Sequence, residues 1–173
     1  LRAVGFDRAS ILDGGFNQWQ KKSLPTSEGN LTFSQSDFIF SPRKNIFVNK
    51  DVVLGAINNP KFKILNSLTA DIHNGENPRY GRPGRIPTSI NVPFHELLDS
   101  ETGKLKKFDE LSKIFQLKGI TKDSCVLNYC GGGIAASLEA FVLYQLGFEN
   151  ITIYDNSLHE WAAIDQTLPM ENS

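Results

Sequence analysis

The fold is decided by residues 125 to 147, which read CVLNYCGGGIAASLEAFVLYQLG. Cys125 to Tyr129 are suited to a buried strand, and they lead into Cys130 and three consecutive glycines. The nearly all-apolar segment Ala135 to Leu146 follows and stops at Gly147, which predicts a buried helix with a glycine at its end. The stretch therefore predicts a strand, a tight turn and a helix, as found in parallel α/β sheets.

The rest of the chain from residue 50 alternates in the same way. Short apolar runs at 62–65, 90–92 and 151–154 predict strands. Helices are predicted over 50–58 and 109–117, the second capped by Asp109. Residues 67–88, rich in Gly and Pro, predict a long loop without regular structure. The alternation predicts an α/β fold with helices on both faces of a parallel sheet, where ligands sit at the carboxyl ends of strands.

Composition excludes several classes of protein. The chain has 173 residues, of which 40% are hydrophobic and 21% are charged, and its mean hydropathy is -0.26. These values are typical of one globular domain with at most an appendage. A net charge of -1 excludes a nucleic-acid polycation, and no run of apolar residues is long enough for a membrane span. No leader is visible at Leu1, so the compartment stays open, with a slight preference for the cytoplasm.

A repeat relates the two ends of the chain. Seven positions recur 142 residues later as the same or a similar residue: Gly5 and Gly147, Phe6 and Phe148, Asp7 and Glu149, Ser10 and Thr152, Ile11 and Ile153, Asp13 and Asp155, Trp19 and Trp161. This offset indicates a duplicated unit, whereas the alternative is one domain that begins with these residues. We expect residues 1–30 to be the C-terminal remnant of a first domain, residues 31–45 a linker, and residues 46–173 a complete catalytic domain.

The loop after the predicted strand carries the candidate chemistry. Cys125 and Cys130 are too far apart on an extended strand for a disulfide without a sharp bend, so at least one thiol is free. Three glycines allow a tight turn with its N–H groups pointing inward, at the positive end of the next helix. A thiolate or persulfide at Cys130 would be stabilised there. We expect Cys130 to be the nucleophile, with an anion-binding loop made of Gly131, Gly132, Gly133, Ile134 and Ala135.

The loop allows three other interpretations. A structural cysteine beside a turn does not require three glycines. The spacing Gly131-x-Gly133-x-x-Ala136 fits a dinucleotide-binding fingerprint, but the eighteen residues after Asp155 are too few for the remaining strands and helices. A cysteine phosphatase needs an arginine at the sixth residue after the nucleophile, where this chain has Ala136. Sulfur chemistry is therefore the favoured interpretation.

Several motifs together resemble the rhodanese sulfurtransferases, most closely their tandem two-domain members of the thiosulfate and 3-mercaptopyruvate types. The motifs are Leu12-Asp-Gly-Gly-Phe-x-x-Trp19, Arg82-Pro-Gly-Arg-Ile-Pro87 with Ile90-Asn-Val-Pro-Phe94, and Tyr129-Cys-Gly-Gly-Gly-Ile-Ala135. The resemblance implies a five-stranded parallel sheet flanked by helices, with the active cysteine in the second copy. A six-residue cysteine loop is the length associated in this family with sulfur rather than phosphate substrates.

The chain departs from this family's pattern at two places. Thiosulfate-type loops carry basic side chains after the cysteine, and mercaptopyruvate-type loops carry hydroxyl groups, but this loop has Gly131, Gly132 and Ala135 there. The strand that usually ends in Asp-x-Arg reads Asn66-Ser67-Leu68. The loop therefore does not identify the sulfur donor.

Three arginines in the predicted long loop are candidate ligands for an anionic donor. Arg79, Arg82 and Arg85 form either a solvated basic loop or a guanidinium set that meets a sulfonyl or carboxylate group. In similar sulfurtransferases the arginines at the first two positions face the cysteine, and histidine is common at the third. We expect all three to bind the donor, with Arg79 and Arg82 as the principal contacts.

The sequence thus predicts a sulfurtransferase. The Cys130 thiolate would take the outer sulfur of a small anionic donor, thiosulfate or 3-mercaptopyruvate, as a persulfide, and pass it to a thiol or cyanide. We expect no metal or organic cofactor, no nucleic acid and no membrane as a partner, but a missing N-terminal rhodanese domain. The alternative, suggested by Asn66, Leu68 and the bare glycine loop, is a rhodanese-like binding or regulatory module with weak or no turnover.

Overall fold

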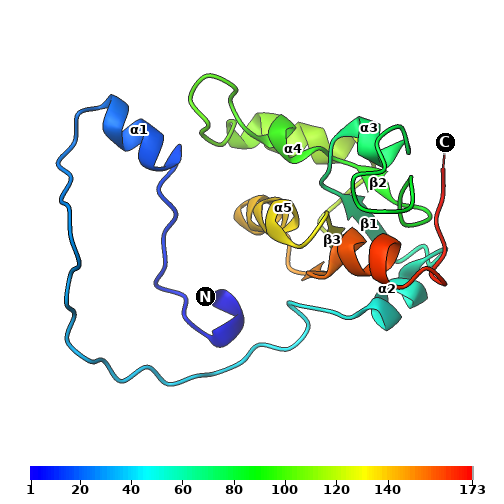
Figure 1. Ribbon diagram of the computed structural model, residues 1–173, viewed down its shortest axis with the longest axis horizontal. Coiled ribbons are helices and arrows are strands. Elements are labelled where there is room, and N and C mark those ends of the chain that lie inside the picture. The colour runs from blue at the N-terminus through cyan, green and yellow to red at the C-terminus, as the bar shows by residue number, and fades with distance from the viewer. Residues whose placement is uncertain (173) are drawn as a thin grey trace.

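The strands form one parallel sheet in the computed structural model, which describes residues 1–172 of the chain (Figure 1). Its order is β2-β1-β3-β4, made of β1 (Phe62–Asn66), β2 (Ile90–Asn91), β3 (Cys125–Tyr129) and β4 (Ile151–Ile153). Asn66 at the end of β1 is the register partner of both Tyr129 and Asn91. The carboxyl ends of three strands therefore meet at one edge of the sheet.

The sheet has four strands among the described residues, so the expectation of five was wrong. The place beside β4 holds an isolated parallel bridge between Phe47 and Ile153, with a hydrogen bond of 2.9 Å from the Val48 N–H to the Ile153 carbonyl. The pairing stops there because Asn49 caps a helix, α2 (Lys50–Ala56), by accepting a hydrogen bond from the Val52 N–H. The fifth strand is reduced to a single bridge.

Helices cover both faces of the sheet, as the alternation predicted. The elements involved are α2, α4 (Phe108–Leu117), α5 (Ile134–Gln145) and the π-helical turn η3 (His159–Ile164). Side chains of α4 and α5 pack with Leu65 and Val126 on one face. Side chains of α2 and η3 pack with Ile64 and Leu127 on the other face, because neighbouring strand residues point to opposite sides.

Two local predictions need correction. Residues 67–88 contain a short helix, α3 (Ala70–His73), since these four residues include no Gly or Pro, and Ile72 and His73 are buried. The helix α4 begins at Phe108 with Lys107 as its N-cap, and Asp109 is inside its first turn. The Glu110 carboxylate accepts a hydrogen bond of 3.1 Å from the Lys107 N–H, which satisfies a donor at the helix start.

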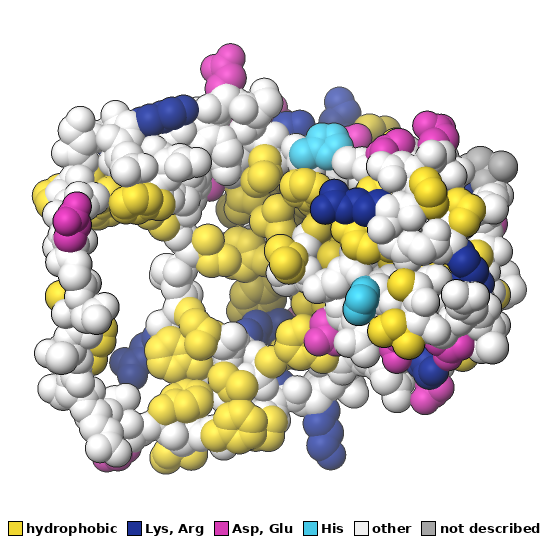
Figure 2. Space-filling model, viewed as in Figure 1, with side chains coloured by type: hydrophobic (Ala, Val, Ile, Leu, Met, Phe, Trp, Pro, Cys, Tyr) yellow, Lys and Arg dark blue, Asp and Glu magenta, His cyan; other side chains and the backbone are white. Residues whose placement is uncertain are grey.

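Residues 1–45 form an arm that curves away from the sheet (Figure 1). It holds two short helices, η1 (Arg2–Val4) and α1 (Gly15–Lys21). The arm touches the domain where the Arg2 guanidinium lies 4.1 Å from the centre of the Tyr144 ring, and where the Leu105 N–H donates to the Asp13 carboxylate. Figure 2 shows hydrophobic side chains gathered on the inner side of this arm. The large hydrophobic residues of the arm that are exposed include Ile11, Leu12, Phe16, Phe33 and Phe40.

Within the described part of the chain, no helix has the length and apolarity needed to cross a bilayer. The same residues contain no group of three or more His, Cys, Asp or Glu side chains that could hold a metal ion.

Candidate active site

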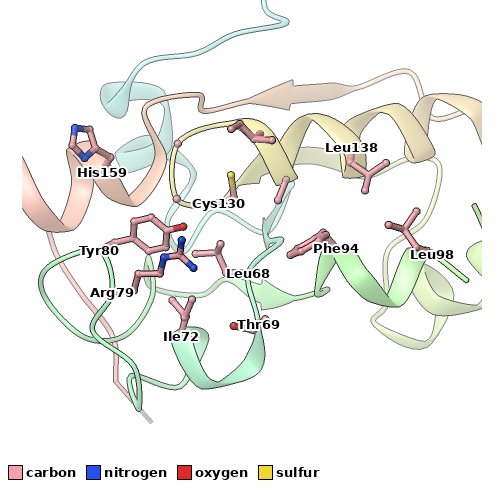
Figure 3. Close-up of a pocket in the computed structure, with 14 residues that line it drawn as sticks. Leu68, Thr69, Ile72, Arg79, Tyr80, Phe94, Leu98, Cys130, Leu138 and His159 are labelled. Carbon is pink, nitrogen blue, oxygen red and sulfur yellow. The ribbon is translucent and has the colours of Figure 1, made fainter. Parts of the chain in front are cut away.

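Cys130 lies at the carboxyl edge of the sheet, between the end of β3 and the start of α5. Its side chain is buried, and it lines a cavity of about 780 Å³ together with Gly131 and Gly132. Figure 3 shows the sulfur at this cavity, with Arg79 and Tyr80 on the side opposite α5. Most of the wall is apolar and consists of Leu68, Ile72, Phe94, Leu98, Ile134 and Leu138.

The three glycines of the loop are needed for different reasons. Gly133 has a φ of +84° and is the N-cap of α5, where a Cβ would lie 3.0 Å from the Asp155 carbonyl oxygen. A Cβ on Gly131 would lie 2.1 Å from Cζ of Tyr80, so that ring occupies the space of a side chain. A Cβ on Gly132 would meet nothing within 4 Å among residues 1–172. A turn therefore requires Gly133, and a close contact requires Gly131.

The backbone of the loop is anchored to the residues after β4. The Cys130 N–H donates a hydrogen bond of 3.0 Å to the Ser157 hydroxyl oxygen. The carbonyls of Cys130 and Gly131 accept hydrogen bonds from the N–H groups of Leu158 and His159, at 3.0 and 2.9 Å. The Cys130 amide thus belongs to the anchor and is engaged away from the cavity.

Ser157 is a site residue that the sequence reasoning missed. Its side chain is buried, its φ is +51°, and its hydroxyl donates to the Tyr154 carbonyl at 2.6 Å. A non-glycine residue in this left-handed conformation is strained and often marks a functional position. The repeat held a signal, since the position 142 residues earlier is Gly15, with a φ of +64°.

Of the three arginines, the structure brings only Arg79 to the cavity. Its side chain is exposed, and its guanidinium carbon lies 5.6 Å from the centre of the Tyr80 ring. Three other lining residues carry polar groups, namely Thr69, Tyr80 and the exposed His159. Arg79 is therefore the cation available to an anionic ligand beside Cys130.

Arg82 and Arg85, which were also expected to contact the donor, are not among the residues that line the cavity. The Arg82 guanidinium donates to the carbonyl oxygens of Trp161 and Leu168 at 2.6 and 2.7 Å, and so holds the segment around η3. Arg85 pairs with the Glu171 carboxylate and joins the end of the described chain to the loop. Both arginines hold backbone segments together, a role that sequence spacing does not reveal.

Asn66 stands at the end of β1, where the family that the sequence resembles usually has an aspartate. Unlike an aspartate, its amide side chain can both donate and accept a hydrogen bond. Its side-chain oxygen accepts from the Leu68 N–H at 3.0 Å, and its side-chain nitrogen lies 3.1 Å from Nδ1 of His73. The amide nitrogen can only donate, so His73 accepts with a neutral ring. Burial, with the nearby Arg85 charge, lowers the pKa of His73 to about 4. Asn66 and His73 are both buried, so their side chains form part of the core at the end of β1.

A buried carboxyl group lies on α5, one helical turn after the loop. Glu139 is fully buried, and its Oε2 accepts a hydrogen bond from the Ser67 hydroxyl. Its Oε1 and the side-chain oxygen of Asn128 lack hydrogen-bond partners among the described residues. Burial raises the pKa of Glu139 to about 8, so the group is mostly protonated at neutral pH. Sequence reasoning missed it because it interrupts an apolar helix without a motif.

Comparison with known proteins establishes the family. The family model described as "Rhodanese-like domain" matches residues 54–164, so the chain belongs to the rhodanese-like family. It is 35% identical over 176 residues to the 3-mercaptopyruvate sulfurtransferase of Escherichia coli K12, covering 99% of this chain and 61% of that enzyme. It is 31% identical to the 3-mercaptopyruvate sulfurtransferase of Rattus norvegicus, covering 93% of this chain and 55% of that enzyme. The chain thus spans about three fifths of the length of these curated relatives.

Two further matches, one in sequence and one in structure, are less similar in sequence. The thiosulfate sulfurtransferase of Gallus gallus is 27% identical over 162 residues, which cover 93% of this chain and 56% of that enzyme. The anaerobic ergothioneine biosynthesis enzyme of Chlorobium limicola, solved with trimethyl histidine, matches with a TM-score of 0.89 and 19% identity. That match covers 99% of this chain and 43% of the other. The structural match therefore extends over the arm as well as the sheet.

Proposed function

We propose that the protein is a sulfurtransferase in which Cys130 carries the transferred sulfur. The observation that carries this proposal is the place of the Cys130 side chain at a cavity that also presents the Arg79 guanidinium. The 3-mercaptopyruvate and thiosulfate sulfurtransferases similar to this chain support it.

The reaction needs two steps at one sulfur atom. The Cys130 thiolate attacks the outer sulfur of the donor, and the bond between that sulfur and the rest of the donor breaks with its electron pair on the leaving group. A thiol or cyanide then attacks the outer persulfide sulfur, which restores the Cys130 thiolate. The start of α5 favours negative charge at the loop in both steps.

The donor is expected to be a small anion such as thiosulfate or 3-mercaptopyruvate. In the glycine loop, Gly131, Gly132 and Gly133 offer no side-chain donors, so a charged contact has to come from Arg79. A guanidinium can bind a carboxylate or sulfonate through two parallel hydrogen bonds. Arg79 is therefore the residue that we assign to donor recognition.

Transfer of sulfur to cyanide tests the proposal. The full chain should form thiocyanate from at least one of the two donors, and Cys130→Ser should abolish the reaction. The matched control is Cys125→Ser, because Cys125 is half-buried at the start of β3 and does not line the cavity. Activity that survives Cys130→Ser, or no activity with either donor, would contradict the proposal.

We further propose that residues 1–30 are the end of a preceding rhodanese-like unit, that residues 31–45 are a linker, and that residues 46–173 are the catalytic unit. Backbone features support the repeat: Gly5 and Gly147 have φ values of +86° and +84°. The Trp19 and Trp161 indoles donate to the carbonyls of Pro25 and Pro169, at 2.9 and 2.7 Å. The greater length of the curated relatives fits this division.

Self-association tests this division. Ile11, Leu12 and Phe16 are more than half exposed, and a preceding unit would cover such apolar surface. The chain should therefore self-associate in a concentration-dependent way, and a variant with all three residues changed to Ser should do so less. A monodisperse monomer at high concentration in sedimentation experiments would count against the proposal.

A further inference from the structure

The Tyr80 hydroxyl is placed against the cysteine loop by a contact that nothing in the loop's own sequence indicates. A Cβ built on Gly131 would lie 2.1 Å from Cζ and 2.3 Å from the hydroxyl oxygen of Tyr80. Since a Cβ lies only about 1.5 Å from its Cα, the phenol tip is in contact with the residue that follows Cys130. Figure 3 shows the hydroxyl end of the Tyr80 ring turned toward the Cys130 side of the cavity.

The Tyr80 hydroxyl also differs from those of the two buried tyrosines at this end of the sheet. Tyr129 lies within hydrogen-bond distance of the Ser89 hydroxyl at 2.9 Å, and Tyr154 donates to the Glu160 carboxylate at 2.6 Å. Within residues 1–172, the Tyr80 hydroxyl has no hydrogen-bond partner, although its half-buried ring packs against the core. A tyrosine whose ring is held and whose hydroxyl is free at a cavity can donate to a ligand.

The cysteine loop itself has no side chain that could donate a hydrogen bond to a ligand. The five residues after Cys130 are glycines, Ile134 and Ala135. The Thr69 hydroxyl, also at the cavity, is engaged with the Asp71 carboxylate, whose pKa it lowers. Arg79 supplies a charge that can hold a carboxylate, but a second donor is needed for another oxygen on the same molecule.

We infer that the Tyr80 hydroxyl donates a hydrogen bond to the carbonyl oxygen of an α-keto thiol donor while the sulfur is being transferred to Cys130. The inference rests on the proposed function and names the donor class as an α-keto acid with a thiol on the neighbouring carbon. Tyr80 is then a catalytic residue, because it contacts the reacting donor.

The chemistry of such a donor places charge on that oxygen. The new bond joins Cys130 Sγ to the donor sulfur, which keeps its hydrogen, and the bond from that sulfur to the methylene carbon breaks. The electron pair of the broken bond is delocalised onto the adjacent carbonyl oxygen, giving an enolate, and water later supplies the proton to carbon. A fixed hydroxyl donor stabilises this oxygen more strongly as its charge develops. Thiosulfate releases sulfite, an anion that needs no such stabilisation.

Single-turnover kinetics of the full chain test the inference with Tyr80→Phe, which keeps the ring that fills the space beside Gly131. With saturating 3-mercaptopyruvate, the rate of persulfide formation should fall about 100- to 1,000-fold, as for the loss of one oxyanion donor. With thiosulfate it should fall less than about threefold. The matched control is Tyr144→Phe, since Tyr144 lies on α5 outside the cavity, and it should behave as the wild type.

Several results would overturn the inference. These are wild-type rates for Tyr80→Phe with 3-mercaptopyruvate, equal losses with both donors, or a wild-type chain that accepts sulfur from thiosulfate alone. A wild-type chain that accepts sulfur from neither donor would instead reject the proposed function itself, so the two failures can be distinguished.

Discussion

The Ser157 hydroxyl accepts a hydrogen bond from the Cys130 amide at 3.0 Å, and thus links the turn after β4 to the nucleophile loop after β3. Ser157 also donates to the Tyr154 carbonyl and has a φ of +51°. One buried side chain therefore fixes the backbone of the candidate nucleophile, at the expense of local strain.

Two substitutions of Ser157 should distinguish the stabilisation that its hydrogen bond gives from the cost of its left-handed backbone conformation. Ser157→Ala leaves the Cys130 N–H without this partner and should lower the free energy of unfolding by about 1–3 kcal/mol. Ser157→Gly loses the same hydrogen bond but relieves the left-handed strain, so it should be about 1 kcal/mol more stable than the alanine variant. Urea unfolding measures both, and two variants as stable as the wild type would contradict this account.

The two glycines after Cys130 should respond differently to a methyl group. Gly131→Ala would place a Cβ 2.1 Å from the Tyr80 ring, displace that ring, and lower the rate of sulfur transfer from 3-mercaptopyruvate by at least about tenfold. Gly132→Ala has room for its methyl group and is the matched control. Thiocyanate formation compares them, and equal rates for the two variants would show that the Tyr80 contact is unimportant.

Substitution of Arg79 should impair donor recognition, whereas substitution of Arg82 should impair stability. Arg79→Ala should lower kcat/KM roughly 10- to 150-fold, the loss of one charged contact worth about 1.5–3 kcal/mol. The ratio should differ between thiosulfate and 3-mercaptopyruvate, because their anionic groups differ in shape. Arg82→Ala should mainly lower the melting temperature, since its guanidinium holds carbonyls around η3. An activity loss below about twofold for Arg79→Ala would remove it from donor binding.

Glu139 should make stability depend on pH. Burial raises its pKa from 4.5 to about 8 in the folded state, so the folded protein holds this proton more tightly than the unfolded chain. This contribution to stability is complete below pH 4.5 and is lost as the pH rises to about 8, with a slope of up to about 1.4 kcal/mol per pH unit.

Glu139→Gln removes the titrating group and keeps a side chain of similar shape. The difference in unfolding free energy between this variant and the wild type should shift in favour of glutamine between pH 5 and 8. Denaturant unfolding at several pH values measures the difference. If the difference stayed constant across that range, Glu139 would not be protonated in the fold.

The sequence predicted the layers of the fold because they depend on local periodicity. Strands such as Cys125–Tyr129 show continuous apolar runs, and the helix after the glycines is marked at both ends. The prediction of a fifth strand was wrong because Asn49 caps a helix there and so ends the strand pairing. Whether such a segment continues as a strand or begins a helix depends on local competition between strand pairing and helix capping. The presence of a short strand at the edge of a sheet therefore depends on this competition and cannot be predicted from the hydrophobic pattern alone.

The sequence predicted a residue of the candidate site only where a reactive side chain also lies at a recognisable position between predicted elements. Cys130 follows a strand and precedes a helix, so its place at the sheet edge could be derived from the sequence. Arg82 carries the same charge as Arg79, and spacing could not show that its guanidinium turns to the carbonyls of Trp161 and Leu168. Tyr80 and Glu139 depend on contacts between segments far apart in sequence, which no local motif records.

The most direct test of the central claim is mass spectrometry of the intact protein after incubation with thiosulfate or 3-mercaptopyruvate, followed by mapping of the modified peptide. A persulfide adds one sulfur atom, so we predict a gain of about 32 Da on the peptide containing Cys130, reversed by cyanide and absent from Cys130→Ser. A gain of mass on Cys125, or an unmodified Cys130 with both donors, would contradict the claim that Cys130 carries the transferred sulfur.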